Sequence, residues 1–511
     1  MTPTLKDLLA AGADASPALS APGREPISHG ELRALIQRTL HTLNGLGIGR
    51  NDRVAIVLNN GPEMAACYMA CASGVTSAPL NPAYRADEFE FYLSDLNAKA
   101  LIVEQGSTSP AIEVAVKLGV RLIDLVVPEG APAGAFTLVA RDARVETPAA
   151  HPGYAEPDDV SMVLHTSGTT SRPKIVPLSQ RNLAASATHI RNTLQFTAAD
   201  CGLNIMPLFH IHGLIAGVLA PLAAGSQVFC TPGFNALKFF SWMDEAHPTW
   251  YTAVPTMHQA IVSRASKNAD VIARHPLRFL RSSSSSMPPQ VIKELEATFH
   301  APLIESYGMT EATHQMASNP LPPALRKPGT VGKAAGPEVA IMAEDGTLLP
   351  RGTGLENTGE IVIRGPNVTA GYENNPKANA EGFLNGWFRT GDQGVMDEDG
   401  YISITGRLKE IINRGGEKVS PREVDEILMD HPGVAQVVCF GMPHAKLGEE
   451  VAAVVVLREG QQATERELQT FVGARAADYK VPKKILFMDE IPKGATGKLQ
   501  RIGLAQKLGL G

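Results

Sequence analysis

A short segment from Thr166 to Lys174 gathers side chains that can bind phosphate. It holds five hydroxyl groups, Gly168 and Lys174 within nine residues, and the apolar run Val160–Leu164 precedes it as a buried strand would. Backbone N–H groups in such a loop can form a nest for an anion, to which the hydroxyls and the lysine add donors. The segment predicts a phosphate site, although a Ser/Thr-rich turn taken alone is equally typical of a plain loop.

Other nucleotide and metal sites find no support in the sequence. The segment is not a Walker A loop, because Gly168 is not followed at the required spacing by Gly-Lys-Ser/Thr. His210 and His212 have no third metal ligand nearby in sequence. The cysteines form no Cys-x-x-Cys pair and are odd in number, which excludes a zinc knuckle and a disulfide framework; they are Cys67, Cys71, Cys201, Cys230 and Cys439.

Composition places the chain among ordinary globular proteins of more than one domain. It has 511 residues, of which 44% are hydrophobic and 19% charged, and a domain usually takes ~100–200 residues. The net charge of −6 gives no support to nucleic-acid or anionic-membrane binding. The N-terminus lacks a secretory signal, and no apolar stretch approaches the ~20 residues that span a membrane. We therefore expect a soluble, cytoplasmic protein.

The elements that must position these residues alternate in the first third of the chain. Helical spacing of apolar residues predicts helices over Glu31–Leu46 and Pro62–Ser73. β-Branched and aliphatic runs predict buried strands over Arg53–Leu58 and Ala100–Val103. Strands alternating with helices through short connections favour an α/β fold with a parallel sheet covered by helices.

Local signals change twice toward the C-terminus. Asp345-Gly346 and Asp399-Gly400 each lie between β-prone runs and predict hairpin turns, so we expect an antiparallel, barrel-like subdomain over residues 330–405. We interpret the acidic run 397–399 as a solvated turn, because no EF-hand spacing follows it. From Arg407 onward the chain becomes slightly basic, which predicts a separate small α/β domain.

Seven motifs in fixed order carry a resemblance to a known family. They are Thr166–Thr170 with Pro173-Lys174, Pro207–His210, Tyr307–Glu311, Gly386–Asp392, Gly406–Lys409, Asn413–Glu417 and Thr496–Lys498. In these segments the chain resembles the AMP-forming acyl-CoA synthetases, which are adenylate-forming enzymes related to luciferase and to nonribosomal-peptide adenylation domains. The resemblance runs from the middle of the chain almost to its end.

The resemblance implies both a fold and an activity. The fold would be a large N-terminal domain of helix-covered sheets over residues 1–406, with the barrel-like subdomain at 330–405, and a small mobile C-terminal α/β lid over 407–511 that swings about a hinge at Lys409. The activity would be ATP-dependent ligation of a carboxylic acid to CoA through an acyl-adenylate, with release of AMP and pyrophosphate. Gly415 and Gly416, as a strand, and Tyr479 would contact CoA.

The resemblance also assigns the nucleotide site. Lys498, Thr310 and Glu311 would be catalytic, with Thr310 and Glu311 holding Mg2+. Tyr307 would stack on adenine, and Asp392 and Arg407 would contact the ribose. The full set expected to bind ATP is Thr166, Ser167, Gly168, Thr169, Thr170, Lys174, Ser285, Glu305, Ser306, Tyr307, Thr310, Asp392, Arg407 and Lys498.

Two positions depart from the family pattern in the phosphate loop. Ser171 and Ile175 stand where many members of the family have Gly. Ser171 keeps a hydroxyl, which suits the nest. Ile175 would be strained at positive φ, so we expect ordinary β dihedrals there.

Hydroxyl and imidazole side chains point to a small acidic substrate. Three segments should line the acid pocket, namely Phe209–His212, Ser282–Ser286 and Thr310–His314. A fatty-acid tunnel would need apolar residues instead, whereas the second carboxylate of a dicarboxylate must be hydrogen-bonded once desolvated. The stretch resembles the oxalate–CoA ligase branch, which implies oxalate held by His210, Ser284 and His314.

Four alternatives stay open at this stage. The acid could be another short one, such as malonate or an acetate-like acid. A stand-alone adenylation module would load a carrier protein instead of CoA, and a luciferase-like oxygenase would share the adenylation step. A non-enzymatic AMP-binding regulator is disfavoured by the presence of Lys498 and the hinge motif. The sequence leaves the oligomeric state open.

Overall fold

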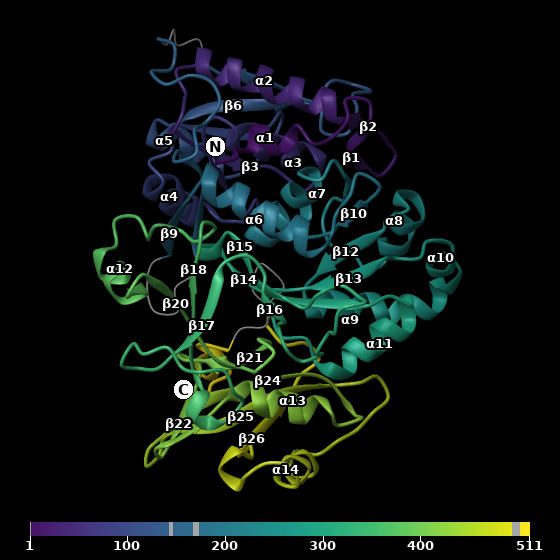
Figure 1. Cartoon of the computed structure of the whole chain (residues 1–511), viewed down its shortest axis with the longest axis vertical. Helices are drawn as coiled ribbons and strands as arrows, with labels where there is room; N and C mark the ends of the chain where they lie inside the picture. The colour runs from purple at the N-terminus through teal and green to yellow at the C-terminus, as the bar shows by residue number, and fades with distance from the viewer. Residues whose placement is uncertain (1, 143–146, 167–172, 493–500) are drawn as a thin grey trace.

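The protein is described by a computed structural model that covers residues 2–142, 147–166, 173–492 and 501–511. Within these residues the strands form four sheets. In Figure 1 the two large sheets occupy the upper and right parts of the molecule, an antiparallel sheet lies on the left, and the C-terminal part lies at the bottom. None of the described helices is long and apolar enough to span a lipid bilayer.

The first sheet is built from N-terminal strands in the order β7-β6-β5-β3-β4-β8-β9. Its central strands pair in parallel, and β7 and β9 at the edges run antiparallel to their neighbours. The strands are β3 (Arg53–Val57), β4 (Thr76–Pro79), β5 (Ala100–Glu104), β6 (Arg121–Val126), β7 (Thr137–Ala140), β8 (Val160–Thr166) and β9 (Lys174–Ser179). The associated helices are α1 (Leu5–Leu9), α2 (His29–Gly45), α3 (Pro62–Ala72), α4 (Ala86–Asp95) and α5 (Ala111–Leu118).

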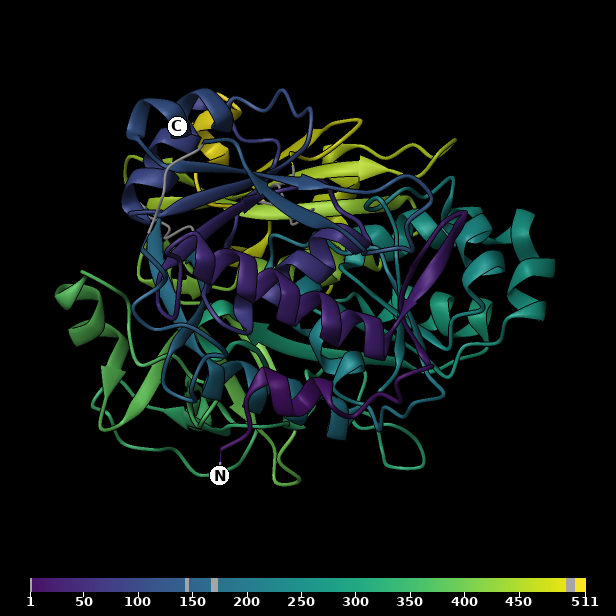
Figure 2. The same cartoon turned by 90° about the horizontal axis from the view of Figure 1, so that it is seen from above.

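Helices cover both faces of this sheet, as the sequence predicts. In β3, Val54 and Ile56 belong to a core shared with α2 and α3, whereas Ala55 and Val57 belong to a core shared with α4 and α5. Successive strand residues point to opposite faces, so an unbroken apolar run suits a strand buried on both sides. Figure 2 shows the long purple helix α2 crossing the molecule on the side nearest the viewer.

The second sheet has the order β16-β15-β14-β13-β12-β10-β11-β1-β2. Its strands are β1 (Pro17–Ala21), β2 (Arg24–Ser28), β10 (Cys201–Asn204), β11 (Gln227–Cys230), β12 (Trp250–Ala253), β13 (Phe279–Ser282), β14 (Leu303–Met309), β15 (His314–Ser318) and β16 (Lys333–Ala334). Between and around these strands lie α6 (Gln180–Thr193), π-helix η1 (His212–Leu219), α7 (Ala220–Leu222), α8 (Phe239–Ala246), α9 (Pro255–Ala265), 3-10 helix η2 (Ser266–Asn268), α10 (Ala269–Arg274), α11 (Pro289–Phe299) and 3-10 helix η3 (Thr310–Ala312).

A shared helical layer separates the two large sheets. The same core cluster contains buried residues of α3, α6, η1 and α7 together with Ile56 of the first sheet and Trp250 of the second. The next residue of β12, Tyr251, belongs to a different core with α8, α9 and α11 on the far face. The molecule therefore stacks helices, sheet, helices, sheet and helices, which keeps both parallel sheets buried.

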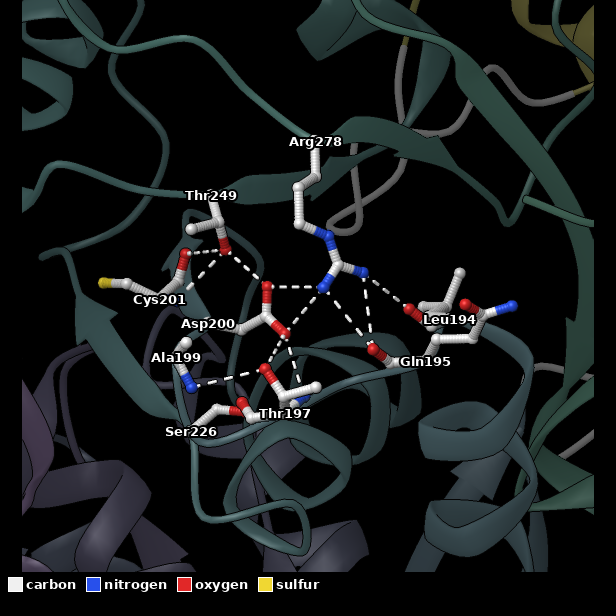
Figure 3. A network of polar contacts seen from close by, with 9 residues as sticks. All are labelled: Leu194, Gln195, Thr197, Ala199, Asp200, Cys201, Ser226, Thr249 and Arg278. Carbon is white, nitrogen blue, oxygen red and sulfur yellow. Dashed lines mark hydrogen bonds and ion pairs between the residues drawn. The ribbon is translucent and has the colours of Figure 1, made fainter. Parts of the chain in front are cut away.

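Asp200 anchors the amino ends of three neighbouring strands in the second sheet (Figure 3). Both oxygens of its carboxylate lie 2.8 Å from Arg278 Nη1, and Oδ1 also accepts a hydrogen bond from Thr249 Oγ1 at 2.8 Å. These residues stand at or just before the starts of β10, β12 and β13. The Asp200 side chain is 2% exposed, so its charge is buried and paired. The Asp200 network does not reach the carboxyl ends of these strands, which lie at the opposite edge of the sheet.

The third sheet is antiparallel, as predicted for this region. It contains β17 (Glu338–Met342), β18 (Gly359–Arg364), β19 (Phe383–Leu384), β20 (Trp387–Met396) and β21 (Ile402–Arg407), with 3-10 helix η4 (Leu355–Asn357) and α12 (Pro376–Gly382). Asp399-Gly400 lies in the turn between β20 and β21, where Gly400 has a φ of 87°. Lys327 pairs with Asp397 and Asp399 at 2.6 and 2.8 Å, which fits the predicted solvated turn.

The C-terminal part has its own sheet and core. Its elements are β22 (Ile412–Arg414), β23 (Glu417–Val419), α13 (Pro421–Met429), β24 (Val434–His444), β25 (Gly448–Leu457), α14 (Glu465–Gly473), 3-10 helix η5 (Asp478–Lys480), β26 (Lys484–Phe487) and α15 (Leu504–Lys507). Val424, Val437 and Val455 belong to a core cluster that contains only residues of this part. The predicted small α/β domain is thus a distinct packing unit.

Candidate functional site

The predicted site residues gather at the carboxyl edge of the second sheet. β10 leads into the loop that carries His210, β13 ends two residues before Ser284, and β14 ends immediately before Thr310 and Glu311. In open α/β sheets, ligands bind outside the carboxyl ends of parallel strands. Segments that are distant in the sequence are therefore brought to one edge, opposite the Asp200 network.

Tyr307, Asp392 and Arg407 form one connected group. The Tyr307 hydroxyl donates to Asp392 Oδ2 at 2.5 Å, and Arg407 Nε lies 3.4 Å from Asp392 Oδ1. Asp392 on β20 and Arg407 on β21 are register partners in the antiparallel ladder. The arrangement places an aromatic ring, a carboxylate and a guanidinium together, which are the groups that can stack on a base and bind sugar hydroxyls.

Glu311 is the buried acid of a second group. Its carboxylate accepts a hydrogen bond from Tyr372 at 2.8 Å, and Lys174 Nζ lies 4.3 Å from the centre of the Tyr372 ring. Burial raises the pKa of the Glu311 carboxyl, while the hydrogen bonds and the nearby Arg407 and Lys174 charges oppose that rise. A cation bound beside Glu311 would favour its ionised form.

Thr310 and Glu311 fit a magnesium ion held mainly by a substrate. In the ranges that the structure describes, no cluster of three or more His, Cys, Asp or Glu could hold a metal unaided. Mg2+ commonly uses one or two protein oxygens and completes its shell with phosphates and water. A single buried carboxylate beside a hydroxyl, with one oxygen already hydrogen-bonded, matches that pattern.

Glu305 and Ser306 support the end of β14. Glu305 Oε2 accepts from the Gly329 N–H at 3.0 Å, and burial raises the pKa of Glu305 to about 8. Ser306 Oγ donates to the Ser282 carbonyl at 3.3 Å and thus ties β14 to β13. Ser285 lines a cavity of about 130 Å3 that also touches Arg422 and other residues of the C-terminal part.

Ser284 and His314 meet at a pair of stacked imidazoles. The rings of His212 and His314 lie 4.8 Å apart with an angle of 20° between their planes. Ser284 Oγ lies 3.1 Å from His212 Nδ1. His212 is 0% and His314 1% exposed. Behind the rings, Arg281 contacts both Nε2 atoms at 3.3 and 3.2 Å.

The backbone around this cluster is held in left-handed conformations. Ser284, Thr313 and His314 have φ values of 74°, 49° and 97°. Such conformations cost roughly 1–3 kcal/mol each in non-glycine residues and concentrate at functional sites. Gly308 makes the His314 conformation possible, because a Cβ at Gly308 would lie 1.9 Å from the His314 carbonyl oxygen.

His210 lies just before the π-helix that begins with His212. The His212 N–H donates to His210 Nδ1 at 3.4 Å, so His210 lies beside the stacked pair. π-Helical turns are rare and often mark functional sites. Gly213 lets the start of the π-helix pack against the backbone of Pro207, because a Cβ at Gly213 would lie 2.2 Å from the Pro207 carbonyl oxygen.

The predicted hinge residue Lys409 lies in an exposed turn between the third and fourth sheets. The N–H groups of Glu410 and Ile411 both donate to the Arg407 carbonyl, at 2.8 and 3.1 Å. The C-terminal part also contacts β21 directly: Arg422 Nη1 donates to the Ile404 carbonyl at 2.5 Å, and Ser420 Oγ donates to the Thr405 carbonyl.

The expectation that Gly415-Gly416 is a strand is wrong. The two glycines form the turn of the hairpin between β22 and β23, in which Arg414 and Glu417 are register partners. Their φ values are 59° and 100°, and two successive positive values match a type I′ turn, which glycine adopts without steric cost. The turn is exposed, and its N–H at Gly415 donates to the Leu447 carbonyl at 2.8 Å.

Tyr479, which the family resemblance assigns to CoA, lies in the 3-10 helix η5 of the C-terminal part. Tyr479 packs partly buried against the C-terminal core. The neighbouring Lys480 Nζ pairs with both carboxylate oxygens of Glu423 at 2.6 and 2.8 Å, so its charge is already compensated within the C-terminal part.

Five predicted ATP-binding residues lie outside the residues that the structure describes. They are Ser167, Gly168, Thr169, Thr170 and Lys498. Thr166 and Lys174, which bracket the phosphate segment, are described and pair with each other across β8 and β9. Ile175 lies in β9, as expected.

Two residues that the structure places in the site, Tyr372 and Arg281, were not predicted from the sequence, and a third, His212, was predicted only as part of a segment. Tyr372 bonds to Glu311 from a position 61 residues later, and no motif pointed to it. His212 belongs to the segment Phe209–His212 that the sequence predicts to line the acid pocket, but it was assigned no individual role there. Arg281 carried a usable signal, because a charged residue that directly follows the apolar pair Phe279-Leu280 needs a buried partner or a function.

Comparison with known protein families and relatives follows the same division of the chain. Residues 10–373 match the AMP-binding enzyme family, and residues 423–498 match the AMP-binding enzyme C-terminal domain. The first match ends within the region of the third sheet, and the second begins in α13.

Relatives match over nearly the full length. An oxalate–CoA ligase from Arabidopsis thaliana is 45% identical, with 96% of this chain and 95% of that protein covered. An oxalate–CoA ligase from Saccharomyces cerevisiae is 41% identical, with 89% and 87% covered. The crystal structure of ATP-bound MatB from Rhodopseudomonas palustris gives a TM-score of 0.87 at 30% identity, with 99% of both chains covered.

Proposed function

Because this chain belongs to the AMP-binding enzyme family, we propose that it joins oxalate to CoA, using ATP and releasing AMP and pyrophosphate. The observation that carries the choice of acid is the contact of half-buried Ser284 with the buried imidazole pair His212 and His314 at the carboxyl edge of the second sheet. Two relatives at 45% and 41% identity, both oxalate–CoA ligases, support the same substrate.

The chemistry requires an activated acid. A carboxylate is a poor acylating agent, because its leaving group would be oxide. In the proposed first step an oxalate oxygen attacks the α-phosphorus of ATP, the bond to the bridging oxygen breaks, and pyrophosphate leaves. In the second step the CoA sulfur, having lost its proton, attacks the adenylated carbon, and AMP leaves.

Cationic groups would stabilise the charge that develops in the first step. We assign the β- and γ-phosphates to the segment from Thr166 to Lys174, in which Ser167, Gly168, Thr169 and Thr170 supply donors. Lys498 is assigned to the reacting carboxylate and the α-phosphate. A positioned cation stabilises a transition state more than a ground state when charge accumulates beside it.

The adenosine moiety would lie against the Tyr307 group. Tyr307 would stack on adenine, while Asp392 accepts from ribose hydroxyls and Arg407 donates to the ribose. The observed contacts among these three residues support that assignment. Glu305, Ser306 and Ser285 would line the nucleotide site from the ends of β13 and β14.

Thr310 and Glu311 would hold Mg2+ at this site. The ion, when bound, neutralises phosphate charge. The protein's own contribution is to keep Glu311 buried, oriented by the Tyr372 hydroxyl and flanked by Lys174.

Oxalate fits the polar wall better than a long or aromatic acid does. The second carboxylate must exchange its hydration for hydrogen bonds when the site closes. Ser284, His314 and His210 would supply those bonds. A fatty-acid chain would gain nothing from buried hydroxyls and imidazoles.

CoA would enter after a change in domain orientation. We propose that the N-terminal domain spans residues 1–406 and the mobile lid residues 407–511, with Lys409 as the hinge. Gly415 and Gly416 would then approach pantetheine as an exposed turn, and Tyr479 would contact the nucleotide end of CoA.

A cytoplasmic location is proposed on a separate ground. All five cysteines are buried free thiols, which suits a reducing compartment. Fractionation of cells that produce the native protein would test it, and recovery in an oxidising compartment would contradict it.

The test is an acid-dependent exchange of pyrophosphate with ATP, followed by product analysis with CoA. We expect oxalate to support exchange and, with CoA present, to yield oxalyl-CoA and AMP. Malonate, acetate and a medium-chain fatty acid serve as comparison acids, and a carrier protein replaces CoA in a parallel reaction. A clear preference for another acid, or transfer only to the carrier, would contradict the proposal.

A further inference from the structure

Arg281 is a fully buried arginine that has no acidic partner among the described residues. It stands in β13 at 0% exposure, and no Asp or Glu among the described residues lies within 4.0 Å of its guanidinium. Burial lowers the pKa of Arg281 to about 9, so the group is still positively charged at pH 7. Arginine is almost never buried unless its charge is paired.

Arg278, three residues earlier, shows what a structural arginine looks like in the same segment. Its Nη1 contacts both carboxylate oxygens of Asp200 at 2.8 Å (Figure 3), and Nη2 donates to the Leu194 carbonyl at 2.9 Å. That pair lies at the amino edge of the sheet, away from the site. Arg281 instead lies at the carboxyl edge, where the candidate substrate residues gather.

Within the described ranges, every hydrogen-bond partner of Arg281 is neutral or can be neutral. Nη1 lies 3.3 Å from His212 Nε2 and 3.4 Å from Thr252 Oγ1. Nη2 lies 3.2 Å from His314 Nε2 and 3.4 Å from Gln315 Oε1. Nε has no hydrogen-bond partner within the described part of the chain. The positive charge is therefore solvated by four polar groups but compensated by none of them.

The contacts with Arg281 favour one set of proton positions on both imidazoles. A guanidinium can only donate, so an Nε2 atom that bonds to Arg281 offers its lone pair, and the neutral ring then carries its proton on Nδ1. Thr252 Oγ1, at 2.7 Å, can also donate to His212 Nε2. His212 Nδ1–H then donates to Ser284 Oγ at 3.1 Å, which leaves the Ser284 hydroxyl hydrogen to point to another acceptor.

We propose that Arg281 is a positioning residue that makes the site selective for small dicarboxylates. It fixes His212 and His314 as Nδ1–H donors, directs the Ser284 hydroxyl through His212, and places an uncompensated positive charge behind all three. A substrate with a second carboxylate supplies the missing negative charge, whereas a monocarboxylate leaves the arginine unpaired. The inference rests on the proposed function and extends it to the origin of acid selectivity.

The experiment compares Arg281→Met and Arg281→Lys with the control Arg278→Met. Arg281→Met removes the charge at similar length, and we expect kcat/KM for oxalate to fall about tenfold to a hundredfold, carried by KM. Rates with glycolate or acetate should be unchanged or higher. Arg281→Lys should restore part of the oxalate activity. Arg278→Met should lower the melting temperature without changing the order of preference among the acids.

A second readout does not depend on turnover or on the folding of an Arg281 variant. In wild-type protein labelled with 15N-histidine, the rings of His212 and His314 should show unprotonated Nε2 atoms, with their resonances assigned through His212→Gln and His314→Gln. An Nε2–H tautomer on either ring would overturn the inference. So would an equal loss of activity toward all acids in a folded Arg281→Met protein.

Failure of the proposed function would look different. If the wild-type enzyme adenylates no dicarboxylate but takes a monocarboxylate well, the substrate proposal fails before any variant is measured. If the wild-type enzyme prefers malonate to oxalate, the kcat/KM of Arg281→Met is measured with malonate, and the same selective loss of activity toward the dicarboxylate is expected.

Discussion

The Tyr307 hydroxyl donates to the carboxylate of Asp392 at 2.5 Å, which joins the end of β14 in the second sheet to β20 in the third. The bond fixes the Tyr307 ring, and Arg407 contacts the other oxygen of the same carboxylate. One short contact thus orients an aromatic face and a hydroxyl acceptor that come from separate sheets. The nucleotide assignment depends on this group.

The first prediction concerns Asp392. Asp392→Asn keeps the shape but removes the charge that Tyr307 and Arg407 both contact. Hydrogen bonds to charged groups are worth about 1.5–3 kcal/mol, so ATP affinity should fall about tenfold to a hundredfold. Titration calorimetry with ATP and AMP would measure it. Tyr307→Phe serves as the comparison and should lose less ATP affinity, because the ring that stacks on adenine remains. Unchanged ATP binding in Asp392→Asn would contradict the ribose assignment.

The second prediction separates the two half-reactions at Lys498. Loss of a cation that acts only in adenylate formation should lower oxalate-dependent pyrophosphate exchange by about a hundredfold to a thousandfold in Lys498→Ala. Thioester formation from supplied oxalyl-adenylate should largely survive. Lys493→Ala is the matched control from the same C-terminal segment. Equal loss in both half-reactions would remove Lys498 from the first step.

The third prediction concerns the turn at Lys409. Proline fixes φ near −65°, so Lys409→Pro should hinder reorientation of the C-terminal part about the turn between Arg407 and Ile411. We expect pyrophosphate exchange to persist while CoA-dependent turnover collapses. Lys409→Ala, which leaves the backbone free, should retain turnover. Normal steady-state turnover in the proline variant would place the hinge elsewhere.

The fourth prediction tests the acid-binding residues themselves. Ser284→Ala and His314→Ala each remove a donor from the proposed distal-carboxylate site, so kcat/KM for oxalate should fall about tenfold to a hundredfold. Acetate should be affected far less, and ATP affinity should barely change. Kinetics with oxalate, malonate and acetate would measure this. Equal losses for all three acids would mean that these residues serve ATP or the shared carboxylate.

The fifth prediction concerns stability and Glu305. Its pKa is raised to about 8 in the folded state by burial, whereas the unfolded chain should ionise near the ordinary value. Between those two values the folded state binds the extra proton, so stability falls as pH rises. Glu305→Gln should remove that dependence. The free energy of unfolding of Glu305→Gln should exceed that of the wild type by an amount that grows between pH 5 and pH 8, to the order of a few kcal/mol. Thermal unfolding without nucleotide would measure it, and a constant difference would contradict the assigned pKa.

Local patterns in the sequence were sufficient for the architecture of most regions. The β-branched run at Arg53–Leu58 can be buried on both faces only within a helix-covered sheet, and β3 has that environment. Asp399-Gly400 similarly marks a hairpin turn, in which Gly400 has a φ of 87° that glycine adopts without steric cost. These signals succeed because they depend on backbone preferences and on side-chain periodicity, which are local.

Gly415 and Gly416 were predicted to form a strand, and the local sequence could not distinguish that strand from a turn. Glycine suits both a strand that another molecule approaches closely and a turn with two positive φ values. The family resemblance favoured the strand, whereas pairing of Arg414 with Glu417 makes the turn necessary. Only the pairing partner distinguishes the two cases, and that partner is set by the folded sheet.

The sequence by itself determined the residue types that bind phosphate, ribose and the acid, because those residues lie in motifs that can be read along the chain in a fixed order. Tertiary structure alone decided that Tyr372 orients Glu311 and that Arg281 lies behind His212 and His314 with no carboxylate from the described residues beside it. The physical reason is that the energy of a buried charge depends on its neighbours across the sheet. Those neighbours come from segments distant in the chain, which no local pattern brings together.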